Sequence, residues 1–361
     1  MTGITDSRLK RLFFFGRPLS PLYSFIMTIR SFFYRKGLFK QYKLEVPVIS
    51  VGNLVFGGTG KTPLVLYIAR LLQQQGRRPA ILSRGYKGSA TDSINVVSTP
   101  DTVLLDASEA GDEPRLLAEK LPGIPVITGK KRFLTGRYAI DSFGADILLL
   151  DDGFQHMALQ RDLDLVLFSA RKGLGNGHVL PGGELREPLA GLNRADALII
   201  NNVDAHHESK AQELIRILKA RFPEIPLFTA GYQPENVLMR IHKGQNDTIS
   251  PEAAGLIPLY GFCGIAGPES FKTTLEKNGM KLLGFKDFPD HHDYSGTDIR
   301  LLLDNARTSG ADGLITTEKD LVKLHRIFPQ ETLLLVQPVQ LRPSGNFDNF
   351  LANSLTALLN L

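Results

Sequence analysis

The segment around residue 57 combines glycines with a lysine and a threonine, residue types that can bind the phosphates of a nucleotide. The apolar run Val46–Val51 precedes it and the apolar stretch Leu64–Leu72 follows it, so the order predicts a strand, a loop and a helix. The loop residues expected to contact phosphate are Gly57, Gly58, Thr59, Gly60, Lys61 and Thr62. Lys61 is expected to bridge the β- and γ-phosphates, and Thr62 to hold Mg²⁺ through its hydroxyl.

This loop departs from the full phosphate-loop (P-loop) pattern at one position. The pattern has a glycine six residues before the lysine, and here Val55 occupies that place. A glycine-rich turn that merely joins a strand to a helix is therefore the alternative interpretation. Phosphate binding is favoured because Gly60, Lys61 and Thr62 lie where a strand is expected to meet a helix.

Two adjacent carboxylates end a second buried-strand pattern, Asp146–Leu150. Parallel α/β sheets form their sites at the carboxyl ends of strands, and Mg²⁺ prefers oxygen ligands. Asp151 and Asp152 are therefore expected to serve a metal beside the P-loop. Because consecutive residues point in opposite directions, the two cannot play the same role. A plain Asp-Asp-Gly turn is the alternative.

A third loop contains Arg186 and Glu187 between two prolines, Pro181 and Pro188. These two side chains could supply a phosphate clamp and another metal ligand. An ordinary polar turn explains the segment equally well.

Two further segments are candidates for acid–base chemistry: Asp112, and the cluster at 290–293 that contains His291 and His292. A carboxylate beside an attacking hydroxyl, oriented by a histidine, assists phosphoryl transfer to an alcohol. Spacing alone cannot join the two segments. The cluster could equally be a metal site, and either segment could be a solvated turn or a helix N-cap.

A parallel sheet covered on both faces is needed to hold these residues, and the alternation of β-rich and helical stretches predicts one. The expected fold is α/β: a P-loop NTPase-like domain with a second, smaller α/β domain. The remaining strands are predicted at Pro79–Ser83, Ile124–Thr128, Leu163–Phe168, Ala197–Asn201, Ile225–Phe228, Ile257–Gly261, Leu282–Phe285, Gly313–Thr316 and Leu333–Val336. The predicted divisions are a helical leader at 1–44, the P-loop core at 45–229, a connection at 230–256 and a C-terminal domain at 257–361.

Composition predicts a folded intracellular protein. At 361 residues the chain exceeds the usual length of one hydrophobic core. The single cysteine, Cys263, excludes an internal disulfide framework and fits a reducing compartment. Residues 1–45 hold nine basic and two acidic residues, whereas the whole chain carries a formal net charge of only +5. The remainder is slightly acidic, which argues against a protein that coats nucleic acid.

The basic leader also has an amphipathic pattern. Apolar residues recur at spacings of three and four and are expected on one helical face: Leu22, Phe25, Ile26, Ile29, Phe32 and Phe33. Arg30 interrupts the apolar run, which falls short of the roughly 20 residues that a transmembrane helix needs. We therefore expect a helix that lies on a membrane surface rather than crossing it. A terminal helix docked on the protein's own core is the alternative.

Three classes of function remain: a small-molecule or lipid kinase, a switching GTPase or metallocentre chaperone, and a membrane-bound binding module without turnover. Guanine specificity usually requires Asn-Lys-x-Asp, and the matching segment reads Asn201-Asn202-Val203-Asp204, without the lysine. This weakens the GTPase interpretation. The binding module leaves the metal and acid–base candidates unexplained.

Taken together, the motifs resemble the tetraacyldisaccharide 4′-kinase family, the lipid A 4′-kinases of Gram-negative bacteria, over nearly the whole chain. The residues that carry the resemblance are 50–54 with 57–63, 82–86, 111–114, 151–156, 175–177, 185–188, 288–292 and 316–320. The string Asp-Asp-Gly-Phe-Gln-His at 151–156 is the most specific of them, and the family also lacks the first P-loop glycine.

The resemblance implies transfer of the γ-phosphate of ATP, with Mg²⁺, to the 4′-hydroxyl of tetraacyldisaccharide 1-phosphate at the cytoplasmic face of the bacterial inner membrane. Asp112 is implied as the catalytic base with His291 as its partner, although His292 remains an alternative. The implied metal residues are Thr62, Asp151, Asp152 and Glu187. Gln155 and His156 are implied to line the same site, and Arg84, Tyr86 and Arg186 to contact substrate or phosphate.

Overall fold

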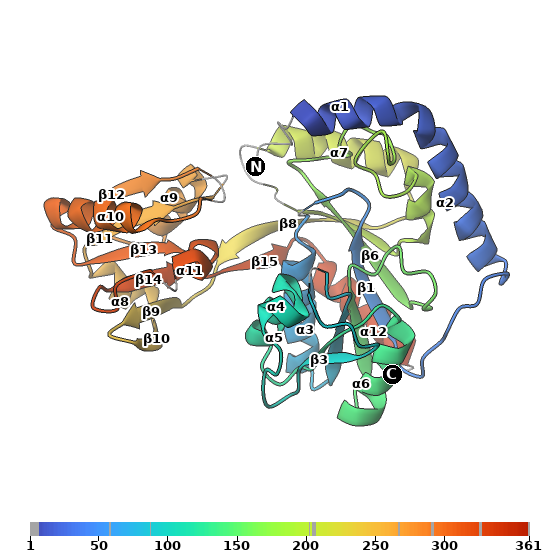
Figure 1. The fold of residues 1–361 in the computed structure, drawn as a ribbon, viewed down its shortest axis with the longest axis horizontal. Coiled ribbons are helices and arrows are strands. Elements are labelled where there is room, and N and C mark those ends of the chain that lie inside the picture. Colours follow the sequence, from blue (N-terminus) through green and yellow to red (C-terminus); the bar gives the residue numbers. More distant parts are fainter. Residues whose placement is uncertain are drawn as a thin grey trace. The chain divides into compact units, whose positions relative to one another are not determined.

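The computed structural model describes residues 7–57, 59–86, 88–201, 203, 207–265, 268–289, 292–324 and 327–359. Two compact units make up the described chain: Tyr232–Gln340, and residues 7–231 together with Leu341 onward. The chain passes from the larger unit to the smaller along β8 (Leu227–Pro234) and returns along β15 (Val339–Pro343) (Figure 1). These two strands are neighbours at one end of the larger sheet.

The two units differ from the predicted segments in two places. The expected connection at 230–256 contains two strands, β9 (Leu238–His242) and β10 (Gln245–Ile249), which pair antiparallel. It is therefore part of the smaller unit's sheet. The C-terminal helix α12 (Phe347–Leu359), expected in the smaller domain, belongs to the larger unit. Its buried residues recur every fourth position and join the core of that unit: Phe347, Leu351 and Leu355.

The larger unit is built on a nine-stranded sheet with the order β15-β8-β7-β6-β1-β5-β2-β4-β3. Besides β8 and β15, its strands are β1 (Val48–Asn53), β2 (Pro79–Ser83), β3 (Asn95–Ser98), β4 (Val126–Thr128), β5 (Ile147–Asp151), β6 (Leu163–Ser169) and β7 (Ala197–Asn201). Neighbours from β8 through to β4 pair in parallel, and β3 pairs antiparallel with β4. The predicted parallel α/β sheet is confirmed.

Helices cover both faces of this sheet, which explains why its strands are apolar without interruption. Alternate residues of β5 enter different cores: Ile147 and Leu149 pack on one face, and Leu148 and Leu150 on the other. The first face is covered by α3 (Lys61–Gln74), α5 (Asp112–Lys120) and α12, and the second by α6 (Arg132–Phe143) and α7 (Glu208–Arg221). The short helices α4 (Ala107–Ala110) and η2 (Leu189–Arg194) lie in connections.

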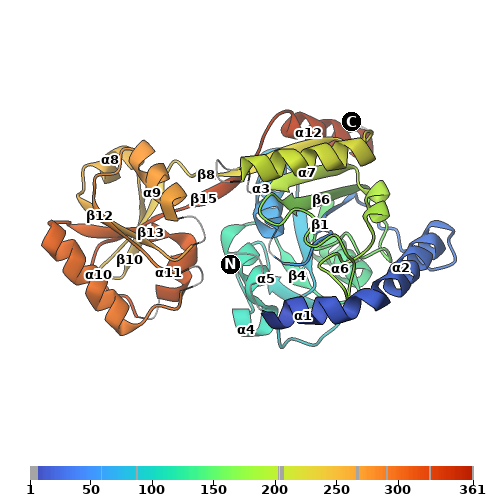
Figure 2. The ribbon, with the colours of Figure 1, turned by 90° about the horizontal axis from the view of Figure 1, so that it is seen from above.

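The leader forms α1 (Ser7–Gly16), η1 (Arg17–Leu19) and α2 (Ser20–Arg35), which follow the outside of the larger unit (Figures 1 and 2). Most of its predicted apolar face is exposed: Leu22, Phe25, Ile26 and Phe32. The apolar residues therefore do not dock on the protein's own core. By length and composition alone, Arg11–Arg35 is long and apolar enough to cross a membrane, so the expectation that it is too short is wrong on this criterion.

The smaller unit has a six-stranded sheet of order β10-β9-β14-β13-β11-β12. Its remaining strands are β11 (Leu259–Cys263), β12 (Leu282–Asp287), β13 (Gly313–Thr317) and β14 (Leu334–Gln337). Its helices are α8 (Pro251–Gly255), α9 (Pro268–Lys277), α10 (Gly296–Ser309) and α11 (Glu318–Leu324). Residues of α10 and α11 pack on one face of the sheet, and residues of α8 and α9 on the other.

Candidate active site

The predicted site residues of the larger unit follow strands that end at one edge of its sheet. Val51 of β1 pairs with Asp151 of β5, and β5 also pairs with β2, which ends at Ser83. The strand order reverses around β1, with β6 and β7 on one side and β5 and β2 on the other. Such a reversal opens a crevice at the carboxyl ends of the strands, where α/β proteins bind ligands.

Two buried asparagines hold the P-loop. Asn53, the last residue of β1, donates from Nδ2 to Val55 O at 2.7 Å and to Thr59 Oγ1 at 3.0 Å. Asn201, the last residue of β7, donates from Nδ2 to Thr59 O at 3.1 Å. Gly60 then precedes α3 with φ 89°, a left-handed conformation that favours glycine. These contacts fix the loop so that Lys61 and Thr62 begin the helix.

Lys61 and Arg186 converge on Asp152. Lys61 Nζ lies 3.7 Å from Asp152 Oδ1, and Arg186 Nη1 lies 2.8 Å from both Asp152 oxygens. Asp152 has φ 58°, an unusual backbone conformation for a residue other than glycine, directly after β5. The Arg186 guanidinium also lies 4.9 Å above the Phe56 ring beside the loop. Two cationic side chains thus contact one carboxylate at the start of α3. Their N–H groups can donate to the oxygens of a phosphate.

Asp151 lies in a different environment from Asp152. It is 1% exposed, and Ser83 Oγ donates to its Oδ2 at 3.3 Å. Burial, followed by the charge of Glu113, raises the pKa of Asp151 to about 7, although Lys61 acts in the opposite direction. Its Oδ1 has no hydrogen-bond partner among the described residues. A buried carboxylate oxygen without a donor suits a hard cation such as Mg²⁺, so the donor set fits the metal that the sequence predicts.

Because burial disfavours its charge, Asp151 should reduce the stability of the metal-free protein. Its pKa is about 7 when folded and near 3.8 when unfolded, so the free energy of unfolding should fall as the pH rises between these values. We expect metal-free Asp151→Asn to melt about 5 °C above wild type at pH 8, with a smaller difference at pH 5. Thermal unfolding in EDTA tests this, with the exposed Asp141→Asn as control. A pH-independent difference would contradict it.

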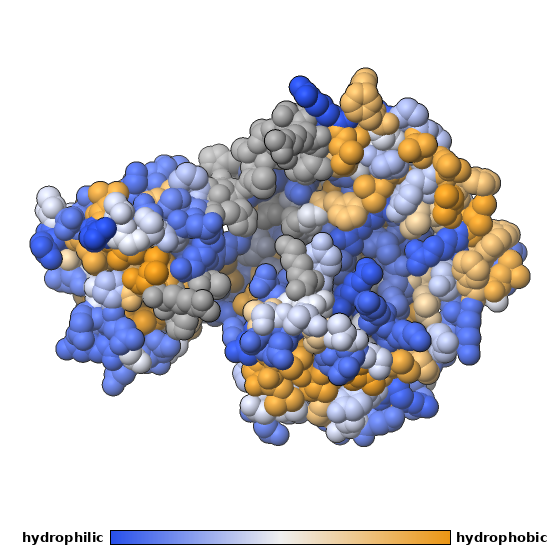
Figure 3. Space-filling model, viewed as in Figure 1, coloured by the Kyte–Doolittle hydropathy of each residue, from blue (hydrophilic) through white to orange (hydrophobic). Residues whose placement is uncertain are grey.

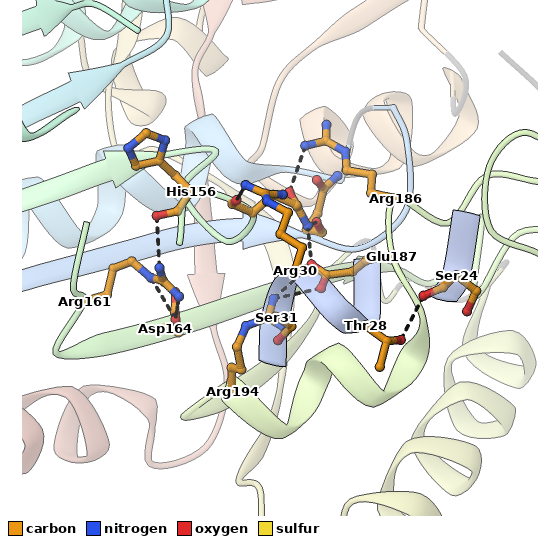
Figure 4. Close-up of polar contacts among 12 residues, drawn as sticks. Ser24, Thr28, Arg30, Ser31, His156, Arg161, Asp164, Arg186, Glu187 and Arg194 are labelled. Carbon is orange, nitrogen blue, oxygen red and sulfur yellow. Dashed lines mark hydrogen bonds and ion pairs between the residues drawn. The ribbon is translucent and has the colours of Figure 1, made fainter. Parts of the chain in front are cut away.

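Gln155 and Glu187 form a second polar cluster beside the P-loop. Figure 4 shows Glu187 with its neighbours Arg194 and Arg186. Gln155 Nε2 donates to Asn53 O and to Glu187 Oε1, each at 3.0 Å. Arg194 Nη2 donates to both Glu187 oxygens, at 3.0 and 2.9 Å, and its guanidinium lies 4.6 Å above the Phe154 ring. Glu187 is therefore buried and fully hydrogen-bonded, whereas Asp151 has a free oxygen.

A buried ion pair holds the turn at 151–156 in place. Arg161 pairs with Asp164 at 2.8 Å and donates from Nη1 to His156 O at 3.0 Å. Burial, together with the charges of Arg132 and Arg161, lowers the pKa of His156 to about 4. His156 is therefore a neutral imidazole at physiological pH, able to donate or accept a hydrogen bond but not to supply charge.

Asp112 and Tyr86 lie on neighbouring segments. Asp112 is the exposed first residue of α5, and a side chain at the preceding Gly111 would come within 2.5 Å of Tyr86 O. Arg84 and Tyr86 follow β2 and are also exposed. The structure thus brings Arg84, Tyr86 and Asp112 to the same edge of the larger sheet as the P-loop.

The histidine candidates belong to the smaller unit. His291 lies outside the described residues. His292 Nε2 lies 3.2 Å from Asp298 Oδ2, and its ring stacks on Phe288 with 4.7 Å between ring centres. These contacts give His292 a structural role at the start of α10. Within the described ranges, no group of three or more His, Cys, Asp and Glu residues is arranged to hold a metal.

Sequence reasoning missed several residues at this edge, of which Arg132 is the most unusual. Its side chain is 3% exposed at the start of α6, it donates to Gly129 O, and its Nε has no partner among the described residues. Burial lowers its pKa to about 10, while the charge of Asp151 acts in the opposite direction. The signal in the sequence was the basic triplet 130–132, one residue after β4. Lys172, which donates to Phe56 O at 3.1 Å, was also missed.

The Asn201 side chain holds the P-loop and is not placed to read a guanine base. Its Nδ2 donates to Thr59 O, and it is fully buried. Asn202 and Asp204 of the proposed guanine-reading segment lie outside the described residues. The position of Asn201 gives the GTPase alternative no support.

Comparisons with known proteins identify the family of the chain. A family model described as tetraacyldisaccharide-1-P 4′-kinase (LpxK) matches residues 12–356. A tetraacyldisaccharide 4′-kinase of Desulfotalea psychrophila is 46% identical over 327 residues, 91% of this chain and 92% of the relative. One from Syntrophus aciditrophicus is 41% identical, covering 86% of this chain and 83% of its own.

A solved structure is also similar over nearly the whole chain. The crystal structure of the "apo" form of LpxK from Aquifex aeolicus in complex with ATP is 32% identical, with a TM-score of 0.68. The match covers 94% of this chain and 97% of that one. The family model alone spans far more than half of the sequence, and the chain therefore belongs to the tetraacyldisaccharide-1-phosphate 4′-kinase family.

Proposed function

We propose that this chain transfers the γ-phosphate of ATP to the 4′-hydroxyl of a tetraacyldisaccharide 1-phosphate, forming lipid IVA in lipid A biosynthesis. The observation that carries the proposal is the meeting of Lys61, Arg186 and Asp152 at the start of α3, beside the buried Asp151. This arrangement matches what phosphoryl transfer needs: cations for the phosphates and oxygen ligands for a metal. The phosphate acceptor, tetraacyldisaccharide 1-phosphate, is inferred from membership of the family.

In the proposed reaction, the loop amides and Lys61 bind the β- and γ-phosphates while Arg186 contacts the transferred group. Thr62, Asp151 and Asp152 would hold Mg²⁺, which when bound supplies positive charge to the phosphate oxygens. Glu187 is assigned a supporting position because both its oxygens already accept hydrogen bonds.

Asp112 is the proposed base that accepts the proton of the attacking 4′-hydroxyl, with His291 as its proposed partner. The exposed position of Asp112 at the sheet edge leaves its carboxylate open to a substrate. Arg84 and Tyr86 are proposed to contact the sugar or its phosphate, since they lie on the neighbouring segment. The neutral His156 is proposed to offer a hydrogen bond on the same edge. Gln155 is proposed to line the site and to hold Asn53 and Glu187, to which its amide group already donates.

The exposed face of the leader supports a membrane-surface location, which we place at the cytoplasmic leaflet of the inner membrane. Figure 3 shows apolar side chains gathered over α1 and α2. Large apolar residues exposed there include Leu12, Phe14, Phe15, Leu19, Leu22, Phe25, Ile26 and Phe32. The opposite face of α2 carries polar contacts to the protein, so the helix is expected to lie along the membrane surface.

Polar substitutions on the outer face should release the protein from membranes. We expect Leu22→Ser, Phe25→Ser and Ile26→Ser together to lower partition onto vesicles of phosphatidylglycerol and phosphatidylethanolamine at least tenfold, because each removes about 1.5–3 kcal/mol of apolar burial. Flotation measures the partition. The melting temperature should hardly change, since the three side chains are exposed. Unchanged flotation would remove the membrane assignment.

The kinase proposal is tested by transfer of ³²P from [γ-³²P]ATP to purified tetraacyldisaccharide 1-phosphate in detergent micelles with Mg²⁺. Labelled lipid that forms with ATP and not with GTP is expected. GTP hydrolysis without labelled lipid would refute the kinase and favour the switching GTPase.

A further inference from the structure

Helix α2 contacts the site cluster through its inner face. Arg30 Nη2 donates to Gln155 O at 3.2 Å, and Tyr23 OH donates to Arg186 O at 3.0 Å. Arg194 Nη1 donates to Ser31 Oγ at 3.4 Å. Figure 4 shows Arg30 and Ser31 directed at the cluster that contains Glu187 and Arg194. One face of the helix therefore contacts the backbone or side chain of site residues 155, 186 and 194.

A close backbone approach fixes where this helix begins. Ser20 Oγ donates to Val179 O at 2.8 Å and accepts from Gly182 N at 3.0 Å. A side chain at Gly182 would come within 2.6 Å of Arg17 Cα, and one at Gly16 within 2.3 Å of Pro181 O. The start of α2 and the loop before Arg186 are thus packed backbone against backbone.

Most of the attachment of α2 is polar, which makes it weak. The inner face buries Ser20 and Met27, Tyr23 packs against the core of the larger unit, and the remaining contacts named above are hydrogen bonds. Each such bond contributes little net stability because it replaces a hydrogen bond to water. The apolar side chains that would hold a helix firmly on a core point outward instead. Docking of α2 can therefore respond to what covers its outer face.

Arg194 links this helix to the carboxylate. Its Nη2 makes a forked contact with Glu187, and its Nη1 reaches Ser31. Glu187 is 2% exposed, so its charge depends on this partner and on Gln155. A shift of Arg194 would move Glu187 and, through Gln155 Nε2, the last residue of β1, Asn53. Asn53 in turn holds the P-loop.

From these contacts we infer that Arg194 is a positioning residue for Glu187 and Gln155, and that helix α2 sets this position when it docks. Binding of the outer face to a lipid surface then favours the arrangement that binds nucleotide. The membrane surface that presents the lipid acceptor thereby raises the turnover of the active site, which lies next to α2. The inference rests on the proposed function for the role of the site, but its geometry concerns nucleotide binding alone.

A charge-matched pair on α2 separates this coupling from plain membrane attraction. Arg30→Gln and Arg35→Gln each remove one positive charge, but only Arg30 contacts Gln155; Arg35 lies over the Phe32 ring. Both should lower partition onto anionic vesicles equally. In neutral detergent micelles, Arg30→Gln should lower kcat/KM for ATP about fivefold, the worth of one hydrogen bond, with little change in KM for lipid. Equal kcat/KM values for ATP in the two variants would overturn the coupling.

The role of Arg194 is tested without lipid. Arg194→Gln should weaken binding of Mg·ATP about tenfold in calorimetry and speed amide hydrogen exchange in residues 20–35 and 186–194. Arg194→Lys keeps the charge but not the fork, and should be intermediate. Wild-type affinity and exchange in Arg194→Gln would overturn the inference. Since these readouts need no phosphate transfer, they hold even if the wild type labels no lipid.

Arg194→Gln could impair folding because it removes a partner of the buried Glu187 carboxylate. Ser31→Ala leaves Glu187 and its partners unchanged, so it tests the same link in a folded protein. The Ser31 variant should fold as wild type and speed exchange within 186–194. Unchanged exchange there would contradict the link between α2 and Arg194.

Discussion

Replacing Lys61 by alanine is expected to lower kcat about 10³-fold, equivalent to about 4 kcal/mol of transition-state stabilisation. Lys61 is the first residue of α3, where the backbone amides of the loop and the helix dipole already favour an anion. Its Nζ lies 3.7 Å from Asp152 Oδ1, and its side chain is 11% exposed. A positive charge that is largely shielded from solvent stabilises the transition state far more than the same charge in water.

The contribution of Lys61 has to be separated from that of a neighbouring lysine, Lys172. Lys172, near the loop, donates its Nζ to Phe56 O. Transfer of ³²P to lipid under single turnover, with Lys61→Arg and Lys172→Ala alongside, measures the effect. We expect Lys61→Arg to recover part of the rate because it restores charge, and Lys172→Ala to retain most of it. Activity of Lys61→Ala within tenfold of wild type would remove the assigned role.

Replacing Asp112 by asparagine is expected to lower kcat by about 10²–10⁴-fold while Mg·ATP affinity stays close to wild type. The substitution keeps the shape of the side chain and removes its ability to accept a proton. Asp112 begins α5 in an exposed position, beside Tyr86 and at the edge where the P-loop lies. A base should affect the chemical step, whereas a phosphate-binding residue should also affect nucleotide affinity.

Glu119→Gln is the matched control for Asp112. Glu119 lies on the same helix and forms an exposed pair with Arg115 at 2.7 Å, so its loss should cost little. Single-turnover rates and calorimetric Mg·ATP binding distinguish the two variants. If Asp112→Asn loses ATP affinity as much as rate, it holds nucleotide rather than the acceptor's proton. If neither falls, Asp112 has no place in the reaction.

The sequence by itself determined the local features of this protein. The P-loop and the acidic strand end were identifiable because a strand, a glycine turn and a helix are adjacent in the chain, so short-range patterns encode them. The parallel sheet followed from apolar runs that alternate with helical stretches. The composition of the leader likewise predicted an amphipathic helix. Each of these signals depends on residues within about one element of each other.

Contacts between distant segments were decided only by the tertiary structure. Asn201 reaches Thr59 across 142 positions, and Arg30 reaches Gln155 across 125. No local pattern marks such pairs, because an asparagine at a strand end or an arginine in a helix has many possible partners. The buried Arg132 was hidden for the same reason: its burial depends on the packing around α6.

The leader shows the difference most clearly. Its periodicity separated an apolar face from a polar one, but periodicity cannot say which face turns toward the protein. The structure turns the polar face inward, with Tyr23, Arg30 and Ser31 on the site loops, and leaves Phe25 and Ile26 exposed. The orientation of α2 follows from polar groups on residues more than 100 positions away, because their buried donors and acceptors require hydrogen-bond partners. The sequence determined that an amphipathic helix exists, and the tertiary structure joined it to the active site.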